Sequence, residues 1–236
     1  MGRYAEALMG AALAALPSHS LLAQQMPVRE DGVSLGEIDY LLQPPHGAAL
    51  HIELAVKIYI VLQGDSGPSY VGPGLRDALI LKLDKLFRHQ LHLADHDVVR
   101  AQFPTSTDYQ PMCWLRGWMF YRMPGEAASP LLATDHLRGW WRCWGEALPA
   151  QRTDSVWRSL PRADWMAPGT AQHDDLSLAD WQAQAEPYFA ATDRPIMVAE
   201  YAPLAEGGTE IARGMVLPAG WPDPAMLATL MARASG

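Results

Sequence analysis

The chain has 236 residues, of which 49% are hydrophobic and 19% are charged, a balance that supplies a large buried core and argues against long disordered tails. The formal net charge is −8 at pH 7, so the composition gives no support for non-specific binding to nucleic acid or to an anionic membrane, although it leaves room for a local basic groove. The two cysteines, Cys113 and Cys143, are too few for a disulfide framework or a cysteine metal cluster and fit a reducing cytoplasm, and no apolar run is long enough to span a bilayer.

The first predicted element is an amphipathic helix that begins near the N-terminus and ends at Pro17. The early Arg3, followed by apolar and small residues, is also typical of a secretory signal, but Glu6 opposes the net positive start that such a signal needs. Apolar residues recur instead at helical spacing, at Ala5, Leu8, Met9, Ala12, Leu13 and Leu16. We therefore expect a helix that belongs to the fold, in a cytoplasmic protein.

Two alternating segments predict a β-hairpin, after a polar loop at about residues 23–34. In SLGEIDYLL, residues 34–42, apolar side chains take one face while Glu37 and Asp39 take the other. Between residues 49 and 62 every second residue is apolar, which is a strong strand pattern. The intervening QPPHG has turn chemistry. One face of this hairpin should pack on helices.

Further elements complete the first half and fill the second. A loop over residues 63–74 should precede a helix over 75–91, and 114–123 should be a strand. In the second half we expect a tryptophan-rich helix, two strands around an EGG turn and a closing helix, over residues 129–148, 194–204, 210–218 and 223–235. Helices and strands thus alternate in the first half, which is an α/β pattern.

The polar faces of the hairpin carry the candidate chemistry. Glu37 and Asp39 lie on one strand and Glu53 and Lys57 on the next, and the hairpin can bring Asp39 beside Glu53. Two carboxylates on one sheet face suit Mg²⁺, which prefers oxygen ligands and keeps several waters. Such an ion lowers the pKa of a bound water and neutralises charge on a scissile phosphate. The alternative is a solvated sheet face with mixed charges.

At these residues the sequence resembles the PD-(D/E)XK, or restriction-endonuclease-like, nuclease superfamily. The segment GRYAE, with Glu6, resembles its first-helix glutamate motif; GEID, with Asp39, its metal-binding aspartate; and HIELAVK, with Glu53, its E-x-K strand. The resemblance implies a restriction-endonuclease-like core over residues 1–125, a mixed sheet flanked by helices. Residues 126–236 would then be a tryptophan-rich α+β elaboration packed on this core.

The same resemblance implies a nuclease that depends on Mg²⁺ or Mn²⁺ and hydrolyses phosphodiester bonds in nucleic acid, DNA rather than RNA. Asp39 and Glu53 would hold the metal, and Lys57 would stabilise the transition state or orient the attacking hydroxide. Glu6 and Glu37 would supply supporting carboxylates. No membrane partner is expected.

The sequence departs from the superfamily pattern at one place, because Ala55 stands where its lysine is expected and the lysine follows at position 57. Four strand residues span about 13 Å, so Glu53 and Lys57 share a site only if the strand bulges or the lysine folds back. Groups from the next helix could replace the lysine or contact backbone phosphates: Lys82, Lys85, Arg88 and Gln90. If none of these groups reaches the site, the protein is a catalytically inactive nuclease-fold protein that binds or scaffolds.

The whole chain also resembles a bacterial family of uncharacterised proteins, domain of unknown function family 1853. The segments that carry this resemblance are LGEIDYLL, HIELAVKIYI, GPGLRDALILKLDKLFRHQL, RGWMFY, HLRGWW, LPRADWMAP and ARGMVLPAGWP. The resemblance implies no activity. It does imply further sequence before GRY in other members, so we expect the first helix to be less supported here.

Overall fold

The computed structural model describes residues 2–65, 67–103 and 108–235, and over these residues the chain is an α/β protein with five α-helices and a nine-stranded mixed sheet. The helices are α1 (Gly2–Ala14), α2 (Leu79–Arg88), α3 (Asp97–Gln102), α4 (Leu178–Ala191) and α5 (Pro224–Ser235), with 3-10 turns η1 (Gln90–Asp95), η2 (Arg162–Trp165) and η3 (Leu204–Glu206). The strands are β1 (Ser20–Glu30), β2 (Val33–Gln43), β3 (Ala49–Gly64), β4 (Gly67–Val71), β5 (Tyr109–Tyr121), β6 (Leu137–Cys143), β7 (Val156–Ser159), β8 (Ile196–Tyr201) and β9 (Glu210–Leu217). The α/β class is therefore confirmed. None of the helices described is long and apolar enough to cross a membrane.

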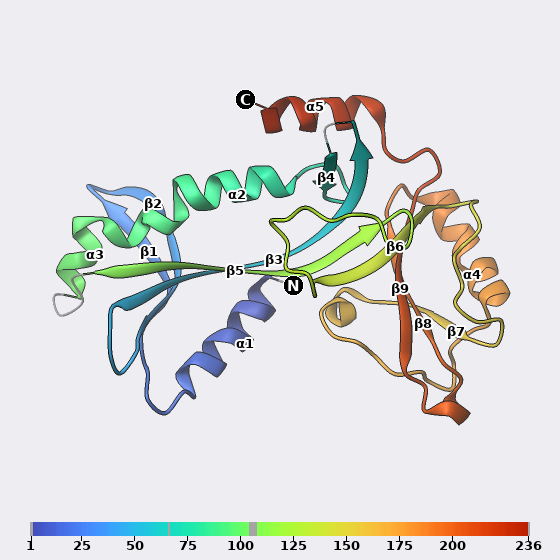
Figure 1. The fold of residues 1–236 in the computed structure, drawn as a ribbon, viewed down its shortest axis with the longest axis horizontal. Coiled ribbons are helices and arrows are strands. Elements are labelled where there is room, and N and C mark those ends of the chain that lie inside the picture. Colours follow the sequence, from blue (N-terminus) through green and yellow to red (C-terminus); the bar gives the residue numbers. More distant parts are fainter. Residues whose placement is uncertain (1, 66, 104–107, 236) are drawn as a thin grey trace. The chain divides into compact units, whose positions relative to one another are not determined.

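The strands follow one another in the order β1-β2-β3-β5-β6-β9-β8-β7, and β4 pairs with β3. The chain divides into two compact units, the first made of Met1–Lys57 and Ile80–Arg116 and the second of Ile58–Leu79 and Gly117–Gly236. Strands β3 and β5 contribute residues to both units (Figure 1).

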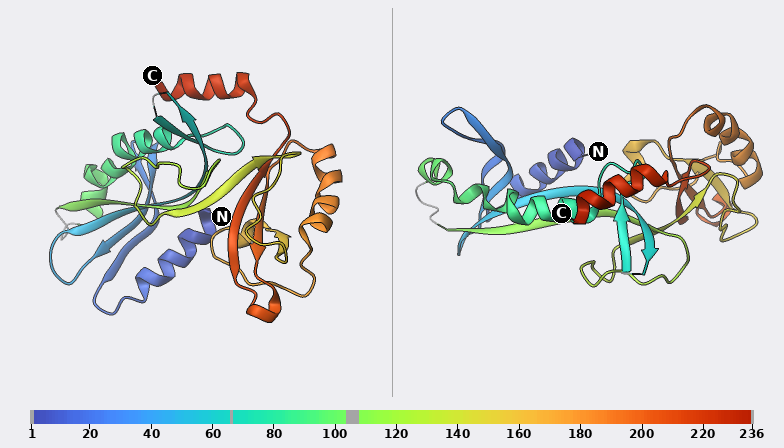
Figure 2. Two further views of the ribbon diagram at one scale, coloured as in Figure 1. Left: turned by 45° about the vertical axis from the view of Figure 1, so that its right-hand side comes forward. Right: turned by 90° about the horizontal axis from the view of Figure 1, so that it is seen from above.

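In the first unit, β1, β2 and β3 form antiparallel neighbours with helices on both faces. Helix α1 lies against β1 and β2 (Figures 1 and 2), where the buried cluster consists of Leu13, Tyr40, Leu42 and Ile52. The second cluster joins the strands to η1 and α3 and consists of Val28, Ile38, Leu41, Leu93, Ala94 and Val99. The hairpin of β2 and β3 is thus confirmed, and it is covered on both faces.

The prediction of a polar loop at residues 23–34 is wrong, because residues 20–30 form β1. Only Val28 of this strand is buried, so its composition is that of an exposed segment. Strand β1 stands at one end of the sheet and pairs with β2 alone. An end strand needs only its backbone to pair, and its side chains can stay polar in water, so it shows no alternation that sequence analysis could detect.

Two expectations around the next helix also need correction. Residues 67–71, expected in a loop, form β4, a short strand that pairs antiparallel with the end of β3. The helix expected over 75–91 is shorter, since α2 begins at Leu79 and ends at Arg88, and η1 follows it. The strand expected at 114–123 is confirmed as part of β5, which begins earlier, at Tyr109.

In the second unit, β5, β6 and β9 run parallel, while β8 pairs antiparallel with both β9 and β7. Helix α4 packs on β7 (Figures 1 and 2). The buried cluster there consists of Trp157, Trp181, Ala185, Val198 and Val216. The two strands around the EGG turn are confirmed as β8 and β9, and the closing helix as α5.

The tryptophan-rich helix expected over residues 129–148 is wrong, because β6 occupies its centre. Trp140 lies opposite Gly214 of β9, and a Cβ atom at Gly214 would come within 2.1 Å of the Trp140 ring. The bulky side chain thus occupies space that a distant glycine leaves open. Pairing with two strands from other parts of the chain decides this segment, and local sequence does not record such pairing.

A close approach at Gly139 of β6 gives a test of this packing. A Cβ atom there would lie 2.5 Å from Phe120 Cε1 and 2.7 Å from the carbonyl oxygen of Arg213. We expect Gly139→Ala to lower the free energy of unfolding by about 1–3 kcal/mol, as overpacked cores do. Gly74→Ala is the control, because nothing lies within 4 Å of its Cβ position. Equal urea denaturation midpoints for the two variants would contradict this packing.

Candidate functional site

The two candidate carboxylates meet where the β2–β3 ladder ends. The paired residues run as far as Tyr40 opposite Ile52. At the next position the Asp39 carboxylate accepts a hydrogen bond from the Leu54 backbone N–H, at 2.8 Å, and the Asp39 backbone N–H lies 3.4 Å from Glu53 Oε1. Side-chain oxygens thus take the place of carbonyl oxygens between the two strands. This exchange holds Asp39 beside Glu53.

Glu53 is only 2% exposed, and both of its oxygens have partners. His51 Nε2 lies 3.1 Å from Oε1, and Gln90 Nε2 donates to Oε2 at 2.9 Å. His51 is fully buried and Ala55 is 7% exposed, so this side of β3 is covered rather than wet. The solvated-face alternative is therefore wrong for this stretch of the strand. Alternation placed these residues on one face, but the covering elements decide what that face contacts.

A lysine from α2 joins the site through a glutamine. Lys82 Nζ donates to Gln90 Oε1 at 2.8 Å, and the same amide donates to Glu53. Burial is the main cause that lowers the pKa of Lys82, and the charges of Lys57 and Lys85 lower it further, while Glu53 opposes them. Two hydrogen bonds through Gln90 therefore connect Glu53 to Lys82.

Glu53 acts on the neighbouring carboxylate of Asp39. The pKa of Asp39 is raised from 3.8 to about 6, first because burial disfavours its charged form and then because Glu53 repels it. The Leu54 N–H opposes this shift by hydrogen bonding to the carboxylate, and Lys82 opposes it by charge. A group with a pKa perturbed by burial and by a specific charged neighbour is typical of a functional site, although structural networks also produce such shifts.

The two expected supporting carboxylates, Glu6 and Glu37, lie in different surroundings. Glu6 lies close enough for its charge to raise the pKa of Asp39, and its backbone carbonyl accepts from the Tyr40 hydroxyl, which ties α1 to β2. Glu37 is exposed and stands opposite Pro27 on β1.

The basic groups on α2 differ in a similar way. Lys85 is exposed, and its charge acts on Lys82. Arg88 forms an exposed ion pair with Asp84, at 2.5 Å. Four groups from this helix and the turn after it were expected to replace the lysine or contact phosphates. Of these, Gln90 and Lys82 are the ones connected to Glu53 by hydrogen bonds.

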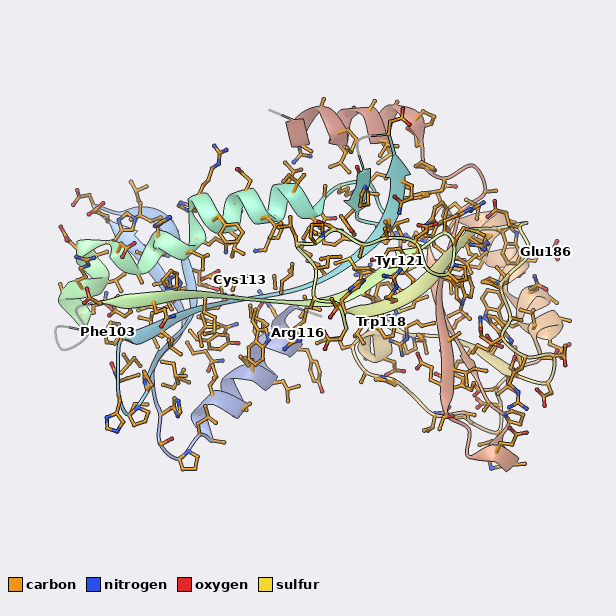
Figure 3. All side chains as sticks on the ribbon, viewed as in Figure 1. Phe103, Cys113, Arg116, Trp118, Tyr121 and Glu186 are labelled. Atoms are coloured by element: carbon orange, nitrogen blue, oxygen red, sulfur yellow. The ribbon has the colours of Figure 1, made fainter. Side chains whose placement is uncertain are left out.

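Two residues near the site had no role assigned from the sequence. His51 has the same strand parity as Glu53, two residues away, and that spacing was sufficient to find it. Cys113 lies on β5 (Figure 3), and its pKa is raised chiefly by burial, with Lys82 and Glu53 acting on it in opposite directions. Nothing in the sequence near Cys113 indicated this position, because it depends on how β5 is placed.

The donor chemistry fits a hard divalent cation. Asp39 and Glu53 supply carboxylate oxygens, the ligands that Mg²⁺ prefers. Within residues 2–65, 67–103 and 108–235, no group of three or more His, Cys, Asp or Glu side chains is arranged to hold a metal ion. A cation here would rest on two carboxylates, with water and substrate oxygens as its other ligands, as is common for Mg²⁺.

Together, the mixed sheet and this site define an α/β protein with a buried glutamate beside a partly buried aspartate at the end of a strand ladder. The chain belongs to the family described as Domain of unknown function (DUF1853), whose family model matches residues 1–217. Comparison with curated proteins and with solved structures finds no match to the chain.

The raised pKa of Asp39 predicts a pH-dependent stability. The folded carboxyl keeps its proton up to about pH 6, whereas an unfolded one loses it near 3.8, so folding loses stability as the pH rises from about 4 to 6. We expect Asp39→Asn, which keeps an oxygen for the Leu54 amide, to be more stable than the parent by about 1–2 kcal/mol at pH 7.5, since solvent screens part of the full shift.

The measurement is urea denaturation with a chelator present, at pH 7.5 and at pH 4. The two proteins should have the same stability near pH 4, where the folded Asp39 is already protonated. A parent as stable as Asp39→Asn at pH 7.5 would contradict the raised pKa of Asp39.

Proposed function

We propose that this protein is a Mg²⁺- or Mn²⁺-dependent nuclease with a restriction-endonuclease-like core, which hydrolyses phosphodiester bonds in nucleic acid, DNA rather than RNA. One observation carries the proposal: the carboxylates of Asp39 and Glu53 lie together at the end of the β2–β3 ladder, and Gln90 links Glu53 to Lys82. Two carboxylates and a lysine are the groups that a metal-assisted phosphodiester hydrolysis uses.

In this proposal each residue has one task. Asp39 and Glu53 hold the metal ion, which when bound lowers the pKa of a water and offsets charge on the phosphate. Lys82 donates N–H groups toward a phosphate oxygen or the attacking hydroxide, and the Gln90 amide holds the lysine in place. Burial lowers the pKa of Lys82, and the charge of Glu53 opposes this shift.

The use of lysine in this chain also supports the proposal. Of 18 basic residues only three are lysines, and all three lie between positions 57 and 85. Lys57 and Lys85 both act electrostatically on Lys82. The basic residues outside this region are all arginines, and the planar guanidinium of arginine and the compact ammonium of lysine are not interchangeable. The gathering of all three lysines near one pair of carboxylates supports a role for an ammonium group there.

The second candidate is a catalytically inactive protein that keeps this fold as a binding or scaffolding module. The observation in its favour is that Glu53 already has hydrogen-bond partners on both oxygens, His51 and Gln90, without any metal. The buried Ala55, at the position where the superfamily carries lysine, points the same way. In this case the polar cluster only holds the elements together.

Cleavage assays separate the two candidates. With Mg²⁺ or Mn²⁺ we expect the purified protein to cut DNA. Glu53→Gln and Asp39→Asn should lose about 100-fold or more in kcat/KM, because either change replaces a charged carboxylate ligand with a neutral amide. Glu30→Gln, at an exposed carboxylate on β1, should be unchanged. A parent that cleaves neither DNA nor RNA, and whose Tm neither ion raises, would support the inactive alternative.

A pair of lysine variants tests which ammonium group acts. We expect Lys82→Met to lower kcat by about 100-fold, since it removes a donor held beside the carboxylates. Lys57→Met should lower kcat by about tenfold or less, because Lys57 is about 13 Å along β3 from Glu53. A larger loss in Lys57→Met than in Lys82→Met, measured in single-turnover assays, would assign the catalytic ammonium group to Lys57.

A further inference from the structure

His51 occupies an unusual position beside Glu53. It lies on β3 two residues before the glutamate, is 0% exposed, and places Nε2 3.1 Å from Glu53 Oε1. Its other ring nitrogen, Nδ1, is buried and has no hydrogen-bond partner among the residues described. Because this buried imidazole has a hydrogen-bond partner at only one nitrogen, few positions of its proton are favourable.

The unpaired nitrogen determines where the proton lies. A proton on Nδ1 would leave a buried N–H without an acceptor, which is unfavourable because the donor has also lost its hydrogen bonds to water. It would also bring the lone pair of Nε2 against the lone pairs of the Glu53 carboxylate. A proton on Nε2 alone avoids both penalties, since Nε2–H then donates to Oε1 and Nδ1 is left as an acceptor. The structure therefore favours a proton on Nε2, which donates to Glu53 Oε1.

We propose that His51 is a positioning residue for Glu53, a role that rests on the proposed nuclease function. His51 holds Oε1 and Gln90 holds Oε2, so the plane of the carboxylate is fixed by a donor at each oxygen. Oε2 retains a lone pair for a metal ion. Partners of this kind orient a ligand before metal binding, and their loss typically weakens metal affinity about 10–100-fold.

Two amide substitutions at His51 distinguish a role in hydrogen bonding to Glu53 from a role in filling space. The side-chain nitrogen of glutamine reaches the place of Nε2, whereas that of asparagine reaches the place of Nδ1, where no partner lies. His51→Gln should therefore keep the donor to Glu53, and His51→Asn should lose it. His92→Asn is the control, because His92 is an exposed histidine of the same unit, paired with Asp95.

The first measurement needs no metal and no activity. In protein labelled with ¹⁵N at histidine, the signals that disappear in His51→Gln belong to His51, and they should show a proton on Nε2. A proton on Nδ1 alone would overturn the proposal, because Nε2 could then not donate to Glu53. This result stands whether or not the protein is a nuclease.

The second measurement is Mn²⁺ affinity by calorimetry, with cleavage rates alongside. We expect His51→Asn to raise the Kd at least about tenfold, and His51→Gln and His92→Asn to stay within about threefold of the parent. Equal losses in the Gln and Asn variants would overturn the positioning role alone. No Mn²⁺ binding by the parent would overturn the proposed metal site, and the positioning role with it.

Discussion

The hydrogen bond from the Leu54 amide to the Asp39 carboxylate is the contact on which the site depends. The β2–β3 ladder ends at Tyr40 and Ile52, so the amide beyond it needs a new acceptor. A backbone oxygen there would continue an ordinary sheet. A side-chain oxygen instead fixes an aspartate at the end of the ladder, where Glu53 is next in register. One local change in strand pairing thus produces the pair of carboxylates.

That arrangement costs stability. Burial and the neighbouring Glu53 raise the pKa of Asp39 to about 6, so at neutral pH the fold holds a charge that it disfavours. A protein under selection for stability alone has no reason to keep two repelling carboxylates in a partly buried position. Conflicts of this kind between local chemistry and the fold are expected at functional sites. Gln90 and Lys82 offset part of the cost without removing it.

Helices and turns on both faces of the strands cover Glu53, while Asp39 stays partly exposed. The Tyr40 hydroxyl binds the backbone of α1 on one side, and Gln90 of η1 covers Glu53 on the other. Both candidate functions need this covering. In a nuclease it restricts the carboxylates to one geometry and lowers the local dielectric. In an inactive protein the same network would only join helices to strands, and membership in the DUF1853 family does not distinguish the two.

The sequence by itself determined the first helix, the hairpin of β2 and β3, the strands β8 and β9 and the closing helix, because alternation and helical spacing are local patterns. It also placed Asp39 and Glu53 on adjacent strands, so the carboxylate pair was predictable. The tertiary structure decided the rest. Strand β1 and strand β6 exist because distant backbones pair with them. The burial of Glu53, and the choice of Lys82 as its linked lysine, follow from how η1 and α2 cover β3, a non-local packing that no spacing along the chain encodes.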